Sequence, residues 1–221
     1  MPNAPIVDIL RPAAPVPDCR ICPRLAAYRD ANRSANPSWF NGAVPSFGPV
    51  DARLLVVGLA PGVRGANRTG RPFTGDFAGI LLYATLLKFG FATGTYGADP
   101  ADGLALTDCR VTNAVRCVPP ANLPAPAEVG SCNPFLAQEF AAMPRLRAVL
   151  ALGGVAHKAV LKARGLRASH VPFAHNSLHR LPDGILLADS YHVSRLNTNT
   201  GRLTTPMFEA VVADIKAHLG D

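Results

Sequence analysis

The stretch VVGLAPGVRGANRTGRPFTGD, residues 56–76, decides how the rest of this chain is interpreted. It continues an apolar run that begins at Leu54, and it then passes into a glycine-rich loop with two prolines and three arginines. The loop ends at Asp76, directly before the helix-like run FAGILLYATLLKF. A buried strand followed by a long glycine-rich loop and a helix is how open α/β sheets form a ligand pocket. Glycines let the backbone approach a ligand closely, and arginines suit phosphate groups.

Short apolar runs of strand length alternate with helical segments along the remaining chain. This alternation predicts an α/β fold with a central, mainly parallel four-stranded sheet that helices cover on both faces. We expect a single domain over residues 1–221, with a proline-rich N-terminal arm over residues 1–17. The predicted strands cover about 53–57, 109–115, 147–152 and 185–190, and the predicted helices cover about 23–33, 77–89, 126–143, 155–163 and 204–219.

The composition limits the class of protein and the kind of partner. Hydrophobic residues make up 48% of the chain and charged residues 17%, which argues against disorder. No apolar run reaches the roughly 18 residues of a membrane span, and no secretory signal is apparent, so we expect a monomeric cytoplasmic protein. The 22 basic and 15 acidic residues give a net charge of +7, which favours a polyanionic partner.

The five cysteines indicate a metal or cluster site rather than disulfides, because their number is odd and no export signal accompanies them. Cys19 and Cys22 form a CxxC half-site, and Cys117 and Cys132 form a looser pair around a proline-rich loop. Four such thiolates could bind zinc or a [4Fe–4S] cluster, and the wide second pair favours the cluster. The alternative is that Cys117 and Cys132 are ordinary buried thiols. Cys109 lies in a strand-like run, and we interpret it as a core residue.

Three loops that follow predicted strands carry the unusual residues of the chain. They cover residues 58–76, 113–116 and 191–202. Because right-handed crossovers bring the carboxyl ends of parallel strands to one edge of the sheet, we expect these loops to meet there in one site.

Four motifs in this order resemble the uracil-DNA glycosylase superfamily, and in particular its iron–sulfur family 5, the B type. They are GLAPG at 58–62, NRTGRPFTGD at 67–76, TNAVRC at 112–117 and YHVSRLNTNTGRLT at 191–204. The resemblance implies a three-layer α/β/α sandwich and the removal of uracil and related deaminated bases from DNA. It also implies a [4Fe–4S] cluster, whose ligands would be Cys19, Cys22, Cys117 and Cys132.

A glycosylase needs an anion near the sugar, because breaking the N-glycosidic bond leaves positive charge on the sugar and negative charge on the base. Asp76 is the candidate, since its carboxylate could stabilise the sugar cation or orient the attacking water. The alternative is a plain N-cap for the helix that begins at Phe77. Related families carry an acid in the first motif, where this chain has Leu59 and Ala60, so Asp76 takes its place as in the B type.

The remaining pocket residues are expected to hold the flipped base. His192 matches the histidine of the family's HPS motif, with Val193 in place of proline. It is the candidate donor to the base oxygen. Without the motif, a structural histidine would be the better interpretation. Asn113 offers a donor and an acceptor to the base edge, or alternatively forms a turn. Phe73 would stack on the base or serve as a core aromatic, and backbone N–H groups around Gly62 could bind the base carbonyls.

The loop at residues 194–202 is predicted to bind DNA. Arg195 and Arg202 suit phosphates, and the Asn/Thr run that begins at Asn197 offers neutral hydrogen bonds. Leu196 matches the family's wedge leucine, which fills the space left by the flipped base. The alternative is a surface loop with one buried leucine.

These residues together predict a monofunctional DNA glycosylase of base excision repair that acts on uracil. We expect it to accept other deaminated bases such as hypoxanthine, and no lysine is placed for a lyase step. One alternative is a non-catalytic iron–sulfur protein of the same fold that binds nucleic acid. Another is a zinc-stapled α/β protein with an unrelated substrate.

Overall fold

The central sheet has five strands in the order β4-β1-β5-β7-β6 in this computed structural model, which describes residues 14–220. Most of the arm predicted over residues 1–17 therefore lies outside the described residues. The first four strands of that order are parallel, and β6 pairs antiparallel with β7. The strands are β1 Leu54–Gly58, β4 Cys109–Asn113, β5 Ala148–Leu152, β6 Leu178–Arg180 and β7 Leu186–Ser190.

The α/β sheet and its four parallel strands are as predicted. The predicted total of four strands is wrong, because the sheet has five. The additional strand, β6, is three residues long and lies at the sheet edge. Its residues are partly or fully exposed, so it lacks the apolar run by which a buried strand is recognised. Its pairing with β7, in which Leu178 lies opposite Ala188, depends on tertiary structure.

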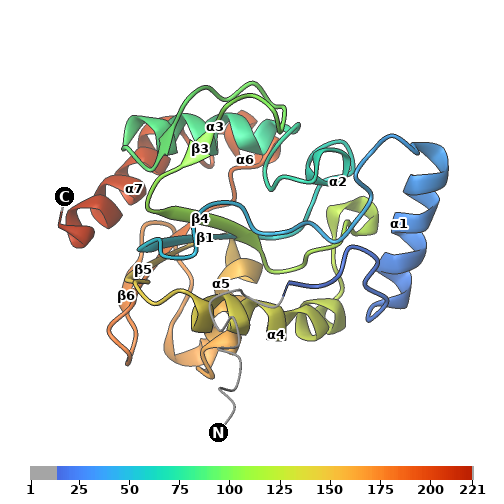
Figure 1. The fold of residues 1–221 in the computed structure, drawn as a ribbon. Helices are drawn as coiled ribbons and strands as arrows, with labels where there is room; N and C mark the ends of the chain where they lie inside the picture. The colour runs from blue at the N-terminus through green and yellow to red at the C-terminus, as the bar shows by residue number, and fades with distance from the viewer. Residues whose placement is uncertain (1–13, 221) are drawn as a thin grey trace, which may run out of the picture.

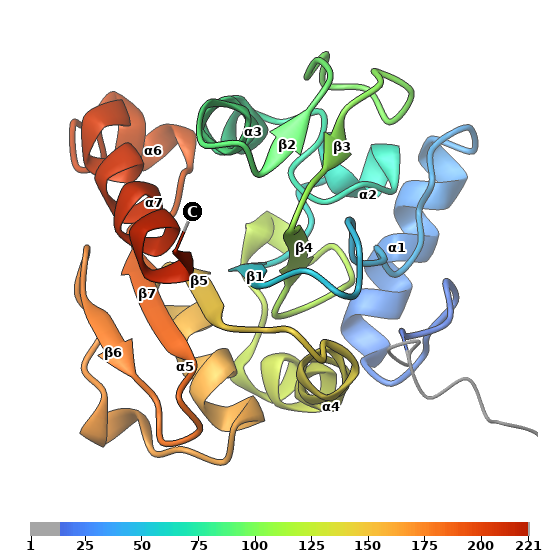
Figure 2. The same cartoon turned by 60° about the vertical axis from the view of Figure 1, so that its left-hand side comes forward.

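Helices cover both faces of the sheet, as Figures 1 and 2 show. Alternate residues of β1 point to opposite faces, so that Leu54 and Val56 join one apolar core while Leu55 and Val57 join the other. The first core includes α3 and α7, and the second includes α4 and α5. The main helices are α1 Pro23–Ala35, α3 Phe77–Lys88, α4 Pro126–Ala142, α5 Gly154–Ala163 and α7 Thr205–Leu219.

Several short elements interrupt segments that the sequence predicts as loops. Two strands, β2 and β3, form a small antiparallel sheet above α3, and two short helices, α2 and α6, lie in the loops that follow β1 and β7. No helix among residues 14–220 is long and apolar enough to cross a membrane. These elements are α2 Ala66–Thr69, β2 Ala92–Thr93, β3 Ala105–Leu106, η1 Pro120–Asn122, η2 Ala168–His170 and α6 Arg195–Asn199.

The parallel register brings the carboxyl ends of the strands together. Gly58, at the end of β1, lies beside Asn113, at the end of β4. Ser190 ends β7 two residues before His192. The loops that carry the candidate residues therefore leave the same edge of the sheet.

Candidate active site

One pocket at this edge brings together residues from all three loops. Asp76, Phe73 and Gly62 come from the loop after β1, Asn113 ends β4, and His192 follows β7. All five line the same pocket. Side chains from distant parts of the sequence thus converge on a small cavity, as a binding site requires.

The Asp76 carboxylate stands at the start of α3 with one oxygen unpaired. Asp76 precedes α3 in the N-cap position, but its side chain makes no cap hydrogen bond. Its Oδ1 is buried and has no hydrogen-bond partner among the described residues. Burial raises the pKa of Asp76 above its ordinary value, although the nearby backbone N–H groups of Gly79 and Ala78 act to lower it. Gly65 leaves the space for this carboxylate, because an added β-carbon there would lie 2.3 Å from Oδ2.

Two tyrosines hold the backbone that presents Phe73. Phe73 has a φ of +53°, a conformation that is uncommon for a bulky residue and costs roughly 1–3 kcal/mol. The Tyr96 hydroxyl donates to the Phe73 carbonyl at 3.0 Å, and the Tyr83 hydroxyl donates to the Pro72 carbonyl at 2.6 Å. These hydrogen bonds stabilise a strained conformation that turns the ring toward the pocket.

Asn113 presents an unused amide beneath the Phe73 ring. It is 3% exposed, and its Oδ1 is buried with no hydrogen-bond partner among residues 14–220. A β-carbon on Gly58 would lie 2.4 Å from this oxygen and 2.3 Å from the Phe73 ring. Only glycine at the end of β1 leaves room for both side chains. A buried polar atom without a partner is costly, and a ligand could satisfy it.

His192 is neutral in this site. Burial lowers the pKa of His192 to about 4. Its ring lies 6.2 Å from the Phe73 ring, between centroids, with the two planes inclined by 30°. The His192 carbonyl accepts a hydrogen bond from the Asn197 side chain at 2.8 Å. Val193, which stands where the family motif has proline, is fully buried in the core and anchors the segment by packing.

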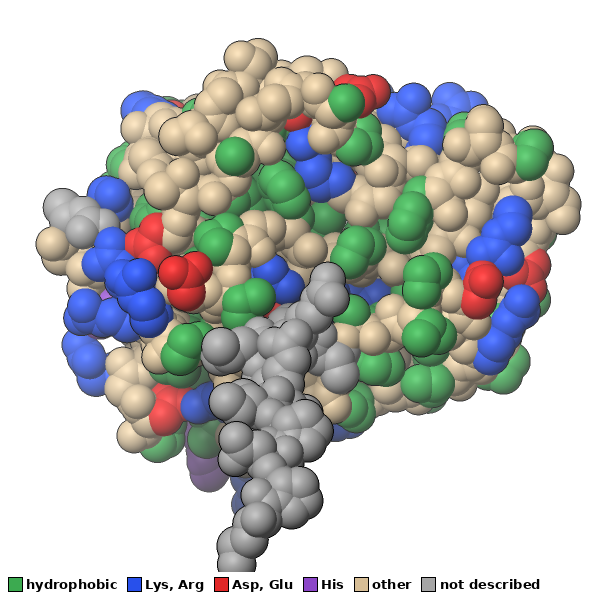
Figure 3. Space-filling model, viewed as in Figure 1, with side chains coloured by type: hydrophobic (Ala, Val, Ile, Leu, Met, Phe, Trp, Pro, Cys, Tyr) green, Lys and Arg blue, Asp and Glu red, His purple; other side chains and the backbone are tan. Residues whose placement is uncertain are grey.

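The predicted DNA-binding loop begins with the short helix α6. Leu196 is 73% exposed, so it is not the buried leucine of the alternative interpretation. The Arg195 guanidinium lies over the Phe77 ring at 5.1 Å, and the Arg202 guanidinium lies over the Tyr191 ring at 4.5 Å. Arg195 and Leu196 line a wide groove together with Asp76 and His192. Elsewhere, on the face drawn in Figure 3, Lys and Arg side chains gather at the margins.

The four predicted cluster cysteines come together near the N-terminal end of α1. Cys19, Cys22, Cys117 and Cys132 line one apolar pocket, whereas Cys109 is buried in the sheet. Burial raises the pKa of Cys117 to about 11, so this thiol stays protonated until a metal binds. Among the described residues, no three acidic, histidine or cysteine side chains surround a single-ion position. Four thiols from two distant segments around one pocket are a donor set of the kind that zinc or an iron–sulfur cluster binds.

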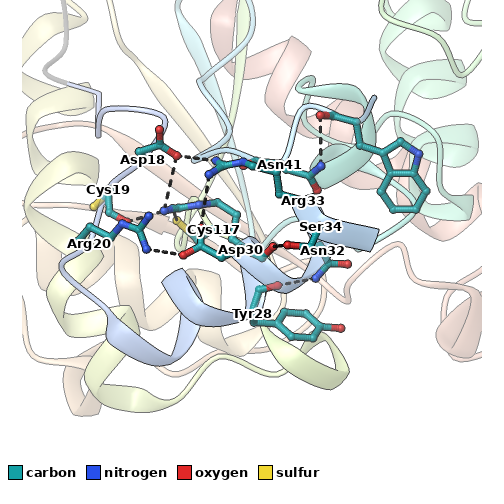
Figure 4. Close-up of polar contacts among 12 residues, drawn as sticks. Asp18, Cys19, Arg20, Tyr28, Asp30, Asn32, Arg33, Ser34, Asn41 and Cys117 are labelled. Atoms are coloured by element: carbon teal, nitrogen blue, oxygen red, sulfur yellow. Dashed lines mark hydrogen bonds and ion pairs between the residues drawn. The ribbon is translucent and has the colours of Figure 1, made fainter. Parts of the chain in front are cut away.

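A buried arginine lies against these thiols. Arg29, in α1, is fully buried, and its Nη1 donates to the Cys19 carbonyl at 3.0 Å and to the Cys117 sulfur at 3.5 Å. Its Nε and Nη2 have no hydrogen-bond partner within residues 14–220, and Asp18 lies 4.0 Å from Nη2. Figure 4 shows the polar contacts around Asp18, Cys19 and Cys117. A buried cation with unused donors suits an anionic group in the thiol pocket.

Comparison with known proteins agrees with this geometry. Residues 45–216 match the sequence profile of the uracil DNA glycosylase superfamily. The chain belongs to this superfamily. A type-5 uracil-DNA glycosylase from Thermus thermophilus is 45% identical over 208 residues, which cover 91% of this chain and 94% of the relative. The protein of the same description from Mycobacterium leprae is 41% identical over 210 residues, with 91% and 92% covered. That from Pyrobaculum aerophilum is 40% identical over 207 residues, with 92% and 90% covered.

The site of this uracil DNA glycosylase superfamily member includes a residue that the sequence analysis missed. Asn122 lies in η1, in the proline-rich loop between Cys117 and Cys132, and it lines the wide groove with Asp76. A β-carbon added to Gly62 would lie 3.2 Å from Asp76 Oδ2 and 3.9 Å from Asn122 Oδ1. An amide and a carboxylate thus flank the same glycine. The sequence signal that could have pointed to Asn122 is the PAN segment at residues 120–122. Asparagine tolerates a positive φ, here +56°, and so favours a tight turn that can fold back toward the site.

Proposed function

We propose that this protein is a type-5 uracil-DNA glycosylase, which removes uracil from DNA by hydrolysis of the N-glycosidic bond and so initiates base excision repair. The observation that carries the proposal is the half-buried Asp76 carboxylate, whose Oδ1 is buried and has no hydrogen-bond partner among the described residues. It shares one pocket with a neutral histidine, an aromatic ring and an unpartnered amide. The identity of up to 45% with type-5 relatives over nearly the whole chain supports the same function.

In this mechanism the flipped base enters the pocket beside Phe73 and Asn113. The Phe73 ring stacks on the base, while Asn113 Oδ1 accepts from the uracil N3–H and Asn113 Nδ2 donates to the adjacent carbonyl. The backbone N–H groups around Gly62 bind a second carbonyl. Asn113 Oδ1, which has no partner among residues 14–220, is thereby satisfied by the base edge.

Bond cleavage then depends on charges placed at both ends of the breaking bond. The Asp76 carboxylate stabilises the cationic sugar and, with the Asn122 amide, orients a water molecule. The water oxygen bonds to C1′ as the bond from C1′ to the base nitrogen breaks, and the electron pair leaves with the base. His192 donates a hydrogen bond to the base oxygen, where negative charge develops. The water proton passes to Asp76 or to solvent.

The α6 segment supplies the contacts that hold the DNA open. Leu196 enters the space left by the flipped base, and Arg195 and Arg202 bind phosphates. Asn197 holds the His192 carbonyl and offers its remaining amide atoms to the backbone. Among the described residues that line the two pockets there is no lysine for a lyase step, and the proposed enzyme is monofunctional. The proposal also takes the enzyme to be a monomer.

The same proposal includes a [4Fe–4S] cluster held by the four cysteine thiolates. When bound, the cluster would tie the N-terminal segment to the loop that carries Asn122, and its contribution is structural. It would replace the protons of the buried thiols and accept hydrogen bonds from Arg29. The ligands are Cys19, Cys22, Cys117 and Cys132.

The deciding experiment compares otherwise identical duplexes that hold uracil, hypoxanthine or thymine at one position. Each duplex is incubated with excess enzyme, and strand breaks are counted after hot alkali. We expect breaks at uracil and none at thymine. We also expect breaks at hypoxanthine, because Leu59 and Ala60 leave the first motif without an acid. Tight binding without breaks at uracil or hypoxanthine would instead indicate a non-catalytic protein.

A further inference from the structure

The loop between the two later cysteines reaches from the thiol pocket to the active site. Its residues 119–125 read PPANLPA. Ala121 and Asn122 both have positive φ, at +54° and +56°, and such conformations persist only where the surroundings hold them. Within residues 119–123 the backbone hydrogen bonds are Asn122 N to Pro119 O at 3.2 Å and Leu123 N to Pro120 O at 3.1 Å. These two bonds are at the long end of the normal range, and contacts from outside the loop add to them.

Arg24, in the first turn of α1, supplies those contacts. Its Nη2 donates at 3.1 Å to the carbonyl of Leu123, the residue next to Asn122. Its Nε and Nη2 also form a two-pronged ion pair with Glu128, at 2.8 and 2.7 Å. Glu128 in turn accepts from the Ala125 N–H at 2.7 Å. One guanidinium therefore holds the loop through the Leu123 carbonyl and, by way of Glu128, through Ala125.

We propose that Arg24 is a positioning residue for Asn122, and this inference rests on the proposed function. Arg24 fixes residues 119–125 so that the Asn122 amide stays beside Asp76 at the water-binding end of the pocket. The helix that follows Cys22 is thereby coupled to the active site through hydrogen bonds. The guanidinium fork is needed for this, because a lysine ammonium could not bind both carboxylate oxygens and the carbonyl in one plane.

An ordinary surface ion pair would leave a different signature from a positioning residue. The Arg24 side chain is about half exposed, and exposed ion pairs contribute little to stability. Loss of such a pair would not change the rate at which the bound enzyme excises uracil. Loss of a residue that acts through Asn122 should lower that excision rate only while Asn122 is present.

The test is a double-mutant cycle of Arg24→Gln and Asn122→Ala on single-turnover excision of uracil, at enzyme concentrations that saturate the duplex. We expect Arg24→Gln to lower the rate about tenfold in the wild-type background, as a misplaced catalytic group does. In the Asn122→Ala background it should lower the rate less than about twofold. The matched control is Lys88→Gln, which removes the exposed Lys88–Glu209 ion pair and should leave the rate unchanged.

Hydrogen exchange supplies a readout that does not depend on activity. In Arg24→Gln, the Leu123 and Ala125 amides should exchange at least about tenfold faster than in the wild type, with no change in Lys88→Gln. Equal rate losses in both Asn122 backgrounds, unchanged exchange in the loop, or loss of iron in Arg24→Gln would each overturn the inference. Wild-type protein that excises no uracil would refute the proposed function, while the exchange result would still decide whether Arg24 holds the loop.

Discussion

Replacing Asp76 with asparagine should remove activity and at the same time stabilise the protein. The Asp76 carboxylate is half-buried, its Oδ1 is buried with no partner among the described residues, and burial raises its pKa. A carboxyl group with a raised pKa disfavours the folded state at every pH above that pKa, because the native protein must hold the charge with little solvation. Asparagine has nearly the same size and no charge. The substitution should therefore remove the free-energy cost of holding a poorly solvated charge, which destabilises the folded wild-type enzyme at neutral pH.

The expected gain in the free energy of unfolding is about 1 kcal/mol, the order of the cost of an unsatisfied buried group. In a protein of this size that corresponds to a rise in melting temperature of about 2–4 °C. The gain should disappear as the pH falls toward 3.8, the ordinary value for aspartate, because the wild-type carboxyl is then protonated in the folded state. Excision of uracil should fall by about 10²- to 10⁴-fold, the usual contribution of a positioned acid or base.

Calorimetry at pH 7 and pH 4 and a single-turnover assay on a uracil duplex measure these effects. Asp51→Asn is the control, because the Asp51 side chain is 68% exposed, and it should change neither quantity. A lower melting temperature for Asp76→Asn with activity retained would refute the reasoning. It would mean that the carboxylate serves α3 as a cap rather than serving the reaction.

Three further changes test other parts of the site. Because burial lowers the pKa of His192 to about 4, the saturated excision rate should be flat between about pH 6 and 8, and a limb near 6.5 that vanishes in His192→Ala would contradict a neutral histidine. Leu196→Ala removes an exposed side chain, so it should leave the melting temperature unchanged while weakening binding to uracil-containing duplex at least about tenfold, as titration by fluorescence anisotropy would show. Arg29→Met should lower iron per protein by at least about half. It should also raise the melting temperature of the metal-free protein, because a buried cation with unused donors and only a distant carboxylate is costly. Unchanged iron together with a less stable metal-free form would refute the pairing.

The sequence predicts the parts of this fold that depend on local pattern. Leu54–Val57 and Ala148–Leu152 are continuous apolar runs, so their burial and their strand length could be read directly. The helix that begins at Phe77 follows from its apolar composition and the Asp before it. Exposed, irregular segments could not be predicted in this way. β6 at Leu178–Arg180 has no apolar run, and it is a strand because it pairs with β7.

The candidate site shows the same division. Asp76, Asn113 and His192 could be named because their motifs resemble those of the family and lie at or after the ends of predicted strands, which a parallel sheet brings together. From position alone, Asp76 would be a helix cap and His192 a structural histidine. Asn122 could not, because its place in the pocket depends on the positive φ of η1 and on how the loop folds back toward Gly62. Likewise, only the structure reveals that Asp76 Oδ1 is buried without a partner among the described residues.

Release of free uracil is the measurement that tests the proposed function most directly. A duplex with one uracil is incubated with excess wild-type protein, the free base is quantified by mass spectrometry, and the strand is examined before and after hot alkali. The account predicts one free uracil per duplex, an intact strand before alkali and a broken strand afterwards. No free uracil would contradict glycosylase activity, and a strand broken before alkali would contradict a monofunctional enzyme.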